Sequence, residues 1–140
     1  MPQRDVFHEV IKAALIKDGW IITHDPFTLS IGIRKVFIDL AGEQLIGGEK
    51  DGTKIAVEIK SFLGESEVAE LEKTVGQYVL YRRVLGEQEP DRELYLAIEE
   101  KTYNGIFSEP IGNLIVTGEQ INLIVFSADK EEIVKWISEI

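Results

Sequence analysis

The chain of 140 residues has the length of one ordinary domain, and its 44% hydrophobic and 29% charged side chains are typical of a folded globular protein. It contains no cysteine, which excludes disulfide bonds, thiolate metal sites and a cysteine nucleophile. Its 25 acids and 15 bases give a net charge of −10, and this sign opposes non-specific adhesion to the phosphates of a nucleic acid.

The first third of the chain predicts a helix followed by extended segments. Apolar side chains recur at helical spacing over residues 3–18, and Gly19 is a natural end for that helix. Short apolar or alternating runs then predict extended segments over 20–23, 27–33 and 36–40. The chain is therefore expected to enter its sheet after one helix.

The stretch 54–60 gives the clearest strand pattern. Its apolar and polar residues alternate, so that isoleucine and valine side chains occupy one face and charged side chains the other. The Asp-Gly pair at 51–52 predicts a two-residue turn to a partner strand over 44–50. In that register Glu43 lies opposite Lys60, so the hairpin is expected to bring charged residues of two neighbouring strands together.

The second half of the chain predicts two helices and three strands. In chain order these are a helix over 66–85, strands over 94–98, 114–116 and 121–127, and a final helix over 129–139. Ser66 is expected to cap the first helix, and Asp129 with Glu132 forms a capping box for the last. Residues 1–140 are therefore expected to form a single α/β domain whose first half runs helix–strand–strand–strand–helix–strand.

Two acids lie inside the predicted strands. Asp39 interrupts the apolar run at 36–40, and Glu58 shares one strand face with Lys60. A buried carboxylate costs several kcal/mol unless it is paired or binds a cation. Alternating charges are ordinary on a half-solvated strand, and an acid at a strand end is often simply hydrogen-bonded. The combination indicates a site, because the strand with Asp39 leads into the hairpin that carries Glu58.

That combination has a chemical rationale. Two carboxylates converging from neighbouring strands form the kind of oxygen site that Mg²⁺ or Mn²⁺ accepts, with waters left on the ion. A bound divalent cation lowers the pKa of its water and offsets the charge that builds on a phosphoryl oxygen. A lysine beside the ion can orient the attacking water or stabilise the transition state. A metal-dependent phosphodiesterase is therefore compatible with the acidic charge of the chain.

The predicted helix adds to the pattern, since Gln77 and Tyr81 are four residues apart and share one of its sides. An acid in one strand, Glu-x-Lys in the next and a helix after it resemble the PD-(D/E)xK nuclease superfamily, and residues 76–81 look like the Gln-x-x-x-Tyr motif of its RecB-like branch. A closer resemblance covers nearly the whole chain. The runs KDGWIITHDP, IAVEIKSF, GQYVLYR and LYLAI, in this order, are similar to the XisH family, known as fdxN element excision controlling factors in cyanobacteria.

The resemblance implies a restriction-endonuclease-like fold, in which helices flank a central mixed β-sheet. By position it implies that Asp39 and Glu58 are metal ligands. It makes Lys60 the catalytic lysine, with Gln77 assisting from the helix and Tyr81 as the motif partner of Gln77. The implied cofactor is Mg²⁺ or Mn²⁺.

The sequence departs from the superfamily pattern at two points. Ile38 precedes the first acid, where the superfamily name has proline, and eighteen residues separate Asp39 from the second acid, a long gap for a simple hairpin. Glu43 and Glu49 are therefore alternatives for the first metal ligand, and we rank them in that order after Asp39. Glu9, on the first predicted helix, stands where some superfamily members place an additional acid, although a solvated helix glutamate reads the same way.

The function implied by the resemblance is that of a metal-dependent DNA endonuclease-like factor that assists excision of a DNA element. The implied partners are DNA, a site-specific recombinase and a companion excision factor, and a homodimer is compatible with it. Because the family name records a genetic role, the alternative is a non-catalytic controlling factor that uses a nuclease-like scaffold for protein contacts. Charge favours this alternative: residues 1–60 carry 8 bases and 9 acids, whereas residues 61–140 carry 7 and 16.

Other kinds of site have little support in the sequence. His8 and His24 are the only histidines, lack metal-like spacing and are expected to be non-functional. Neither a Gly-x-Ser-x-Gly elbow nor a phosphate-binding glycine loop is present. No apolar run approaches the roughly 20 residues of a membrane helix. The polar residues 1–5 do not resemble a secretory signal, so a cytoplasmic protein without membrane contact is expected.

Overall fold

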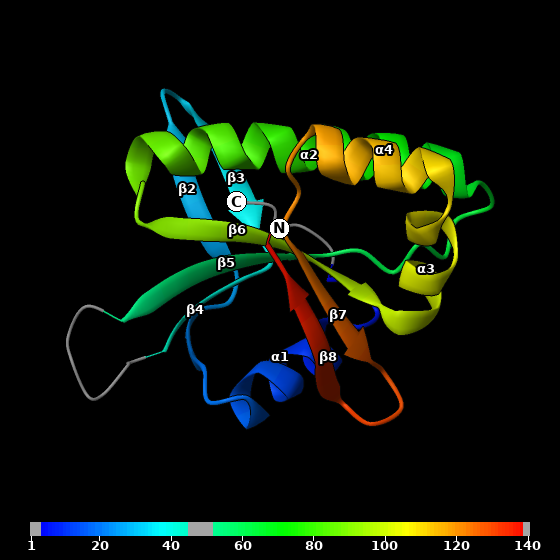
Figure 1. Ribbon diagram of the computed structural model, residues 1–140. Coiled ribbons are helices and arrows are strands. Elements are labelled where there is room, and N and C mark those ends of the chain that lie inside the picture. The colour runs from blue at the N-terminus through cyan, green and yellow to red at the C-terminus, as the bar shows by residue number, and fades with distance from the viewer. Residues whose placement is uncertain (1–3, 45–51, 139–140) are drawn as a thin grey trace.

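The computed structural model describes residues 4–44 and 52–138, which form a mixed β-sheet with helices on both faces and a two-stranded sheet beside it (Figure 1). The first part contains α1 (His8–Lys17), β1 (Ile21–His24), β2 (Phe27–Ile31), β3 (Arg34–Ile38), β4 (Leu40–Gln44) and β5 (Thr53–Ile59). The second part contains α2 (Glu67–Gln88), β6 (Arg92–Glu99), α3 (Glu100–Asn104), the 3₁₀ turn η1 (Ile106–Ser108), α4 (Pro110–Gly118), β7 (Leu123–Ser127) and β8 (Glu132–Ile137). Among the described helices none is both long and apolar enough to cross a membrane.

The main sheet has the strand order β1-β4-β5-β6-β7-β8. Its centre is parallel, because α2 connects β5 to β6 and the segment with α3 and α4 connects β6 to β7, whereas the outer pairs are antiparallel. Strands β2 and β3 pair only with each other in the described chain. The expectation of a central mixed sheet flanked by helices is confirmed, but five strands rather than three separate the first two helices.

Two hydrophobic clusters cover opposite faces of the main sheet. The cluster under α2 and α4 includes Ala56 and Tyr78, and the cluster under α1 includes Ile11, Ile55 and Val57. Figure 1 shows α2 and α4 on one side of the sheet and α1 on the other. Successive residues of β5 enter opposite clusters, which confirms the alternation read from the sequence and directs its even-numbered residues toward α2.

The two long helices lie close to their predicted ranges. Ser66 caps α2 as predicted, since its Oγ accepts a hydrogen bond from the Ala69 amide at 3.2 Å. Helix α2 continues past Gly86, where the sequence predicted its end. Helix α1 begins later than predicted, because the Asp5 carboxylate accepts a hydrogen bond from the Phe7 amide and holds the preceding residues outside the helix.

The strand predicted over 36–40 is divided at Asp39. Strand β3 ends one residue before Asp39 in the small sheet, and β4 begins one residue after it in the main sheet. Ile38 and Leu40 enter opposite hydrophobic clusters, whereas residues two apart on one strand would share a face. Asp39 therefore marks the corner where the chain passes from one sheet to the other.

The hairpin register predicted for β5 is wrong. Glu43 lies opposite Lys54, not Lys60, and Gln44 lies opposite Thr53. The predicted register assumed a two-residue turn, whereas residues 45–52 separate the last pair of β4 and β5. Most of the predicted partner strand over 44–50, with its glycines, lies outside the described residues.

The strand predicted over 114–116 is a turn of helix α4. Three consecutive apolar residues do not distinguish a short buried strand from a helix. Pro110 occupies the first turn of α4, where a missing amide hydrogen costs nothing. Val116 is buried, whereas Leu114 remains 76% exposed on the surface of the domain.

The helix predicted over 129–139 is strand β8 within the described part of that range. Ile133 and Trp136 have helical spacing, but the pairing with β7 shifts between Ile133 and Lys135, so both side chains pack against the cluster under α1. Glu131 adopts a left-handed φ of 51° in the turn that precedes the strand. A β-bulge thus produced the spacing that suggested a helix.

Tyr78 attaches α2 to the sheet, and replacing it tests that attachment. Its side chain is 1% exposed, and its hydroxyl donates to the Leu94 carbonyl at 3.0 Å and accepts from the Asn122 amide at 3.1 Å. We expect Tyr78→Phe to lower the free energy of unfolding by about 1–3 kcal/mol, because both hydrogen bonds are lost from a buried position. Urea denaturation measures this change beside Tyr103→Phe, a half-buried tyrosine, and an unchanged midpoint for Tyr78→Phe would contradict it.

Candidate functional site

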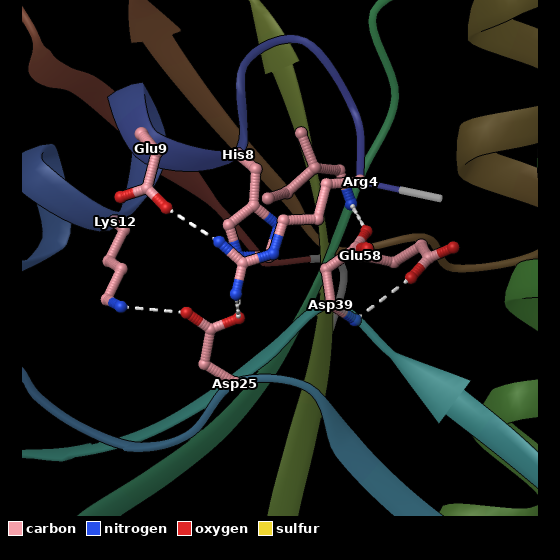
Figure 2. A network of polar contacts seen from close by, with 8 residues as sticks. Arg4, His8, Glu9, Lys12, Asp25, Asp39 and Glu58 are labelled. Atoms are coloured by element: carbon pink, nitrogen blue, oxygen red, sulfur yellow. Dashed lines mark hydrogen bonds and ion pairs between the residues drawn. The ribbon is translucent and has the colours of Figure 1, made fainter. Parts of the chain in front are cut away.

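Asp39 lies beside the end of β5. Leu40 pairs with Val57, so Asp39, the residue before Leu40, lies next to Glu58 at the end of β5. The Ile59 amide donates to Asp39 Oδ2 at 2.7 Å, and the Asp39 amide donates to Glu58 Oε1 at 3.3 Å (Figure 2). These two bonds hold both carboxylates against the same short piece of backbone.

Glu58 lies on the face of β5 that is turned toward α2, and Lys60 directly follows the strand. Glu58 is only 5% exposed, and Ala56 on the same face belongs to the cluster under α2. Lys60 Nζ lies 3.7 Å from Glu58 Oε2, and the Lys60 side chain keeps 18% of its surface exposed. The site therefore combines a buried carboxylate with a partly solvated ammonium group.

Glu58 resists ionisation in this environment. Its pKa rises from the ordinary 4.5 to about 9, mainly through burial, and the charge of Asp39 and a hydrogen bond to its side chain contribute in the same direction. The ammonium group of Lys60 lowers the pKa but does not offset burial. Two acids this close in a buried place are stabilised either by a proton or by a cation.

Helix α2 brings Tyr81 close to the same carboxylates. Burial, together with the negative charges of Glu58 and Asp39, raises the pKa of Tyr81 to about 12. Gln77 lies one turn earlier on the same side of α2, and its Oε1 is buried with no hydrogen-bond partner among the described residues. The structure thus groups four predicted site residues, with Gln77 one helical turn away.

Glu43 lies away from this group. It sits opposite Lys54, four residues before Glu58 on β5, which corresponds to about 13 Å along a strand. Its Oε1 is 4.0 Å from Nη2 of the buried Arg92. Of the two described candidates for the first acid, Asp39 is therefore the one beside Glu58, and Glu49 lies outside the described residues.

The segment before α1 reaches the end of β5. The Asp5 carboxylate accepts a hydrogen bond from the Ser61 amide at 3.0 Å, directly after Lys60. Glu9 is exposed and forms an ion pair with Arg4 at 2.8 Å. The predicted additional acid is therefore engaged with a base of the same segment.

A polar cluster missed by the sequence analysis surrounds Asp25 (Figure 2). His8 Nε2 lies 2.7 Å from Asp25 Oδ1, and Lys12 Nζ lies 2.7 Å from Asp25 Oδ2. Burial raises the pKa of Asp25, but the hydrogen bonds from Lys12 and His8 outweigh it and lower the pKa below its ordinary value. His8, with Glu9 and Asp25, has ligand atoms within 4.8 Å of one another.

The Asp25 cluster is arranged as an ion-pair network. Arg4 and Lys12 already supply positive charge to the carboxylates, so a metal would have to displace them. The spacing of His8 and Lys12 on one helix face was the only sequence signal for it. Nothing local in the sequence associates Asp25 with that face, because the contact joins α1 to the turn after β1.

The oxygen donors of Asp39 and Glu58 fit a hard divalent cation. Mg²⁺ and Mn²⁺ bind carboxylates and retain water, and Asp39 and Glu58 offer such oxygens beside the same short piece of backbone. The Lys60 ammonium group stands beside this donor pair, near Glu58. The arrangement can hold a divalent cation and place an ammonium group next to it.

Comparisons with known proteins agree on one family. The chain matches the family described as "XisH protein" over residues 1–134. It is similar to the crystal structure of an XisH family protein from Nostoc punctiforme PCC 73102, with 38% identity, TM-score 0.87 and coverage of 96% of this chain and 100% of that one. It is also similar to a fdxN element excision controlling factor protein from Anabaena variabilis, with 43% identity, TM-score 0.86 and the same coverage. No curated protein matches the chain.

Proposed function

The chain belongs to the XisH family, and from this membership and its carboxylate pair we propose that it is a divalent-metal-dependent DNA endonuclease that assists excision of a DNA element. The observation that carries the proposal is the grouping of Asp39, Glu58 and Lys60 at the end of β5. We further propose that the mixed sheet with flanking helices is a restriction-endonuclease-like fold of the PD-(D/E)xK type.

Each residue of the group has a role in this proposal. Asp39 and Glu58 would hold Mg²⁺ or Mn²⁺, which when bound supplies an activated water and positive charge for a phosphoryl oxygen. Lys60 orients the attacking water or a phosphate oxygen, since its ammonium group is partly solvated yet tied to Glu58. Gln77 offers a buried acceptor for a hydrogen bond. Tyr81, also on α2, lies on the side of the site that faces this helix.

The biological part of the proposal follows from a relative. The Anabaena variabilis protein is named a fdxN element excision controlling factor, and its match covers 96% of this chain and all of that one. We propose the same role here, with DNA as substrate and with a site-specific recombinase and a companion factor as partners. The net acidic charge requires the cation before phosphate can approach the carboxylates.

Incubation with DNA tests the activity directly. Supercoiled and single-stranded DNA are incubated with the full chain and Mg²⁺ or Mn²⁺, and in parallel with EDTA. We expect nicked or linear product only where the metal is present. Absence of product with either metal and on both substrates would contradict the endonuclease proposal.

Metal binding has its own prediction at Asp39. We expect Mn²⁺ or Mg²⁺ to raise the melting temperature of the wild type. At a metal concentration one hundred times the Kd, the gain in the free energy of unfolding is about 2.7 kcal/mol. Asp39→Asn should lose this shift. Asparagine still accepts a hydrogen bond from the Ile59 amide, so the corner keeps its geometry. Glu43→Gln, on the strand that follows Asp39 but away from Glu58, is the control and should retain the shift. Equal shifts in both variants would place the metal elsewhere.

A second candidate is a non-catalytic controlling factor that acts through protein contacts. The charge of residues 61–140, with 16 acids against 7 bases, favours it because this surface suits a protein more than DNA. Excision measured in cells separates the candidates. Excision that persists with both Lys60→Ala and Glu58→Ala supports the scaffold, whereas its loss in both supports the enzyme.

A further inference from the structure

Helices α2 and α4 lie on the same side of the main sheet (Figure 1). Residues of both helices line an apolar groove. Its volume is about 450 Å³, and its walls include Val68 and Val75 from α2 and Ile111 and Leu114 from α4. The groove is separate from the candidate site at the end of β5, since neither Glu58 nor Lys60 lines it. It is therefore a second feature that the proposed nuclease activity does not use.

The groove exposes large apolar side chains in one place. Leu114 is 76% exposed, Val68 47% and Ile111 42%. Single exposed apolar residues are normal on a protein surface, but several gathered on two adjacent helices are typical of a binding surface. Gly76 adds to the hollow, because a Cβ atom at this position would meet nothing within 4 Å.

The surroundings of the groove are acidic. Glu72 lines it, and among the described lining residues there is no lysine or arginine. Residues 102–129, which include all of α4, contain no basic side chain, whereas Glu109 and Glu119 stand at the two ends of the helix. The first turn of α2 carries Glu67 and Glu70, and over residues 67–76 the three acids Glu67, Glu70 and Glu72 outnumber the one base, Lys73. A partner that combined apolar anchors with positive charge would complement this surface.

We propose that the groove between α2 and α4 binds one basic amphipathic helix of a partner protein. The residues of α2 that line the groove are 68, 71, 72, 75 and 76, so this wall is a straight ridge of about two helical turns. Another helix can pack along such a ridge with apolar side chains at positions i, i+3 and i+4. A second copy of this chain fits less well, because two such surfaces face to face would bring Glu72 and its acidic neighbours together. This inference is independent of the proposed endonuclease activity.

Synthetic peptides test the proposal with the full-length protein. The probe is an amphipathic helix of about 18 residues built from leucine and lysine, compared with the same peptide carrying glutamate for lysine and with a scrambled sequence. Binding is measured by fluorescence anisotropy, and the site by amide chemical shifts in ¹⁵N NMR spectra. We expect the leucine–lysine peptide to bind at least about tenfold more tightly than either control and to shift amides of residues 68–76 and 111–115.

Two matched variants locate the binding. Gly76→Arg places a long side chain in the groove, whereas Gly86→Arg adds the same charge on the same helix outside it; neither position has an atom within 4 Å of a new Cβ. We expect Gly76→Arg to weaken binding at least about tenfold and Gly86→Arg to leave it nearly unchanged. Equal weakening in both, shifts confined to other elements, or no binding at all would overturn the proposal. So would a wild-type dimer in sedimentation that Gly76→Arg dissociates, since a second copy would then be the occupant.

Discussion

Replacing Lys60 with alanine is expected to lower metal-dependent DNA nicking by at least about 100-fold, because an ammonium group aimed at developing charge contributes this much in comparable sites. Its Nζ lies 3.7 Å from Glu58 Oε2, next to the donors for the cation. The measurement is the initial rate of conversion of supercoiled plasmid with Mn²⁺ at saturating metal. Folding should be little affected, since the Lys60 side chain keeps contact with solvent.

The control for this experiment is Lys54→Ala. Lys54 lies opposite Glu43 at the start of β5, whereas Lys60 directly follows the end of that strand. Lys54→Ala also removes one positive charge, so a general loss of attraction for DNA would affect both variants alike. A rate for Lys60→Ala that equals the rate for Lys54→Ala would contradict the catalytic role of Lys60.

Glu58→Gln is expected to stabilise the metal-free protein while abolishing nicking. The carboxyl is 5% exposed and its pKa is raised to about 9, so a charge at this position opposes folding near neutral pH. Glutamine has nearly the same shape and still accepts the hydrogen bond from the Asp39 amide. We expect a gain of about 2–4 kcal/mol at pH 8 with EDTA, or about 5–10 °C in melting temperature.

The sign of the pH dependence follows from proton binding. The folded-state pKa of Glu58 lies above the ordinary 4.5, so between these values the folded protein binds more protons than the unfolded chain. The stability of the wild type should therefore fall as pH rises from 4.5 toward about 9, and the advantage of Glu58→Gln should grow over the same range. Thermal melts with EDTA at several pH values measure this difference.

Added metal should reduce the stability advantage of Glu58→Gln over the wild type. A cation held by Asp39 and Glu58 stabilises the wild type, whereas the amide of Glu58→Gln is a poor ligand, so Mg²⁺ or Mn²⁺ should reduce the gap between the two proteins. A matched variant is Glu43→Gln, which replaces a half-buried acid of β4. It should show no gain in stability with EDTA, and metal should stabilise it as much as the wild type. A Glu58→Gln protein less stable than the wild type at pH 8 with EDTA would show that Glu58 is ionised and structural.

Both predictions describe a site kept at a cost in stability. A buried acid beside another acid is unfavourable for an empty protein, and stability is commonly reduced at positions retained for activity. The second candidate function, a scaffold for protein contacts, gives no reason for the pair at this position. The nicking and stability experiments therefore test the same hypothesis through different observables.

Local patterns predicted several parts of this site correctly. Alternation along 54–60 placed Glu58 on the face of β5 that carries Ala56, because successive side chains of a strand point to opposite sides whatever surrounds it. The cap of Ser66 is equally local, since the hydroxyl needs only an amide three residues ahead. The shared side of Gln77 and Tyr81 follows from helical spacing alone.

Other features required contacts between distant segments. The position of Glu43 depended on the length of the connection to β5, and the predicted two-residue turn placed it opposite the wrong lysine. The spacing of Ile133 and Trp136 belonged to a bulged strand, because pairing with β7 satisfied the backbone that a helix would have satisfied internally. The cluster around Asp25 arose only when α1 met the turn after β1.

The sequence by itself determined the types of α1, α2, β5 and β6 and the face of β5 on which Glu58 stands, because these depend on backbone periodicity within a few residues. Only the tertiary structure decided which acid lies beside Glu58. Asp39 reaches it because the chain changes sheets at that residue, and the change is visible in the opposite burial of Ile38 and Leu40. Sheet exchange and strand register depend on how distant segments pack, and no local spacing encodes that packing.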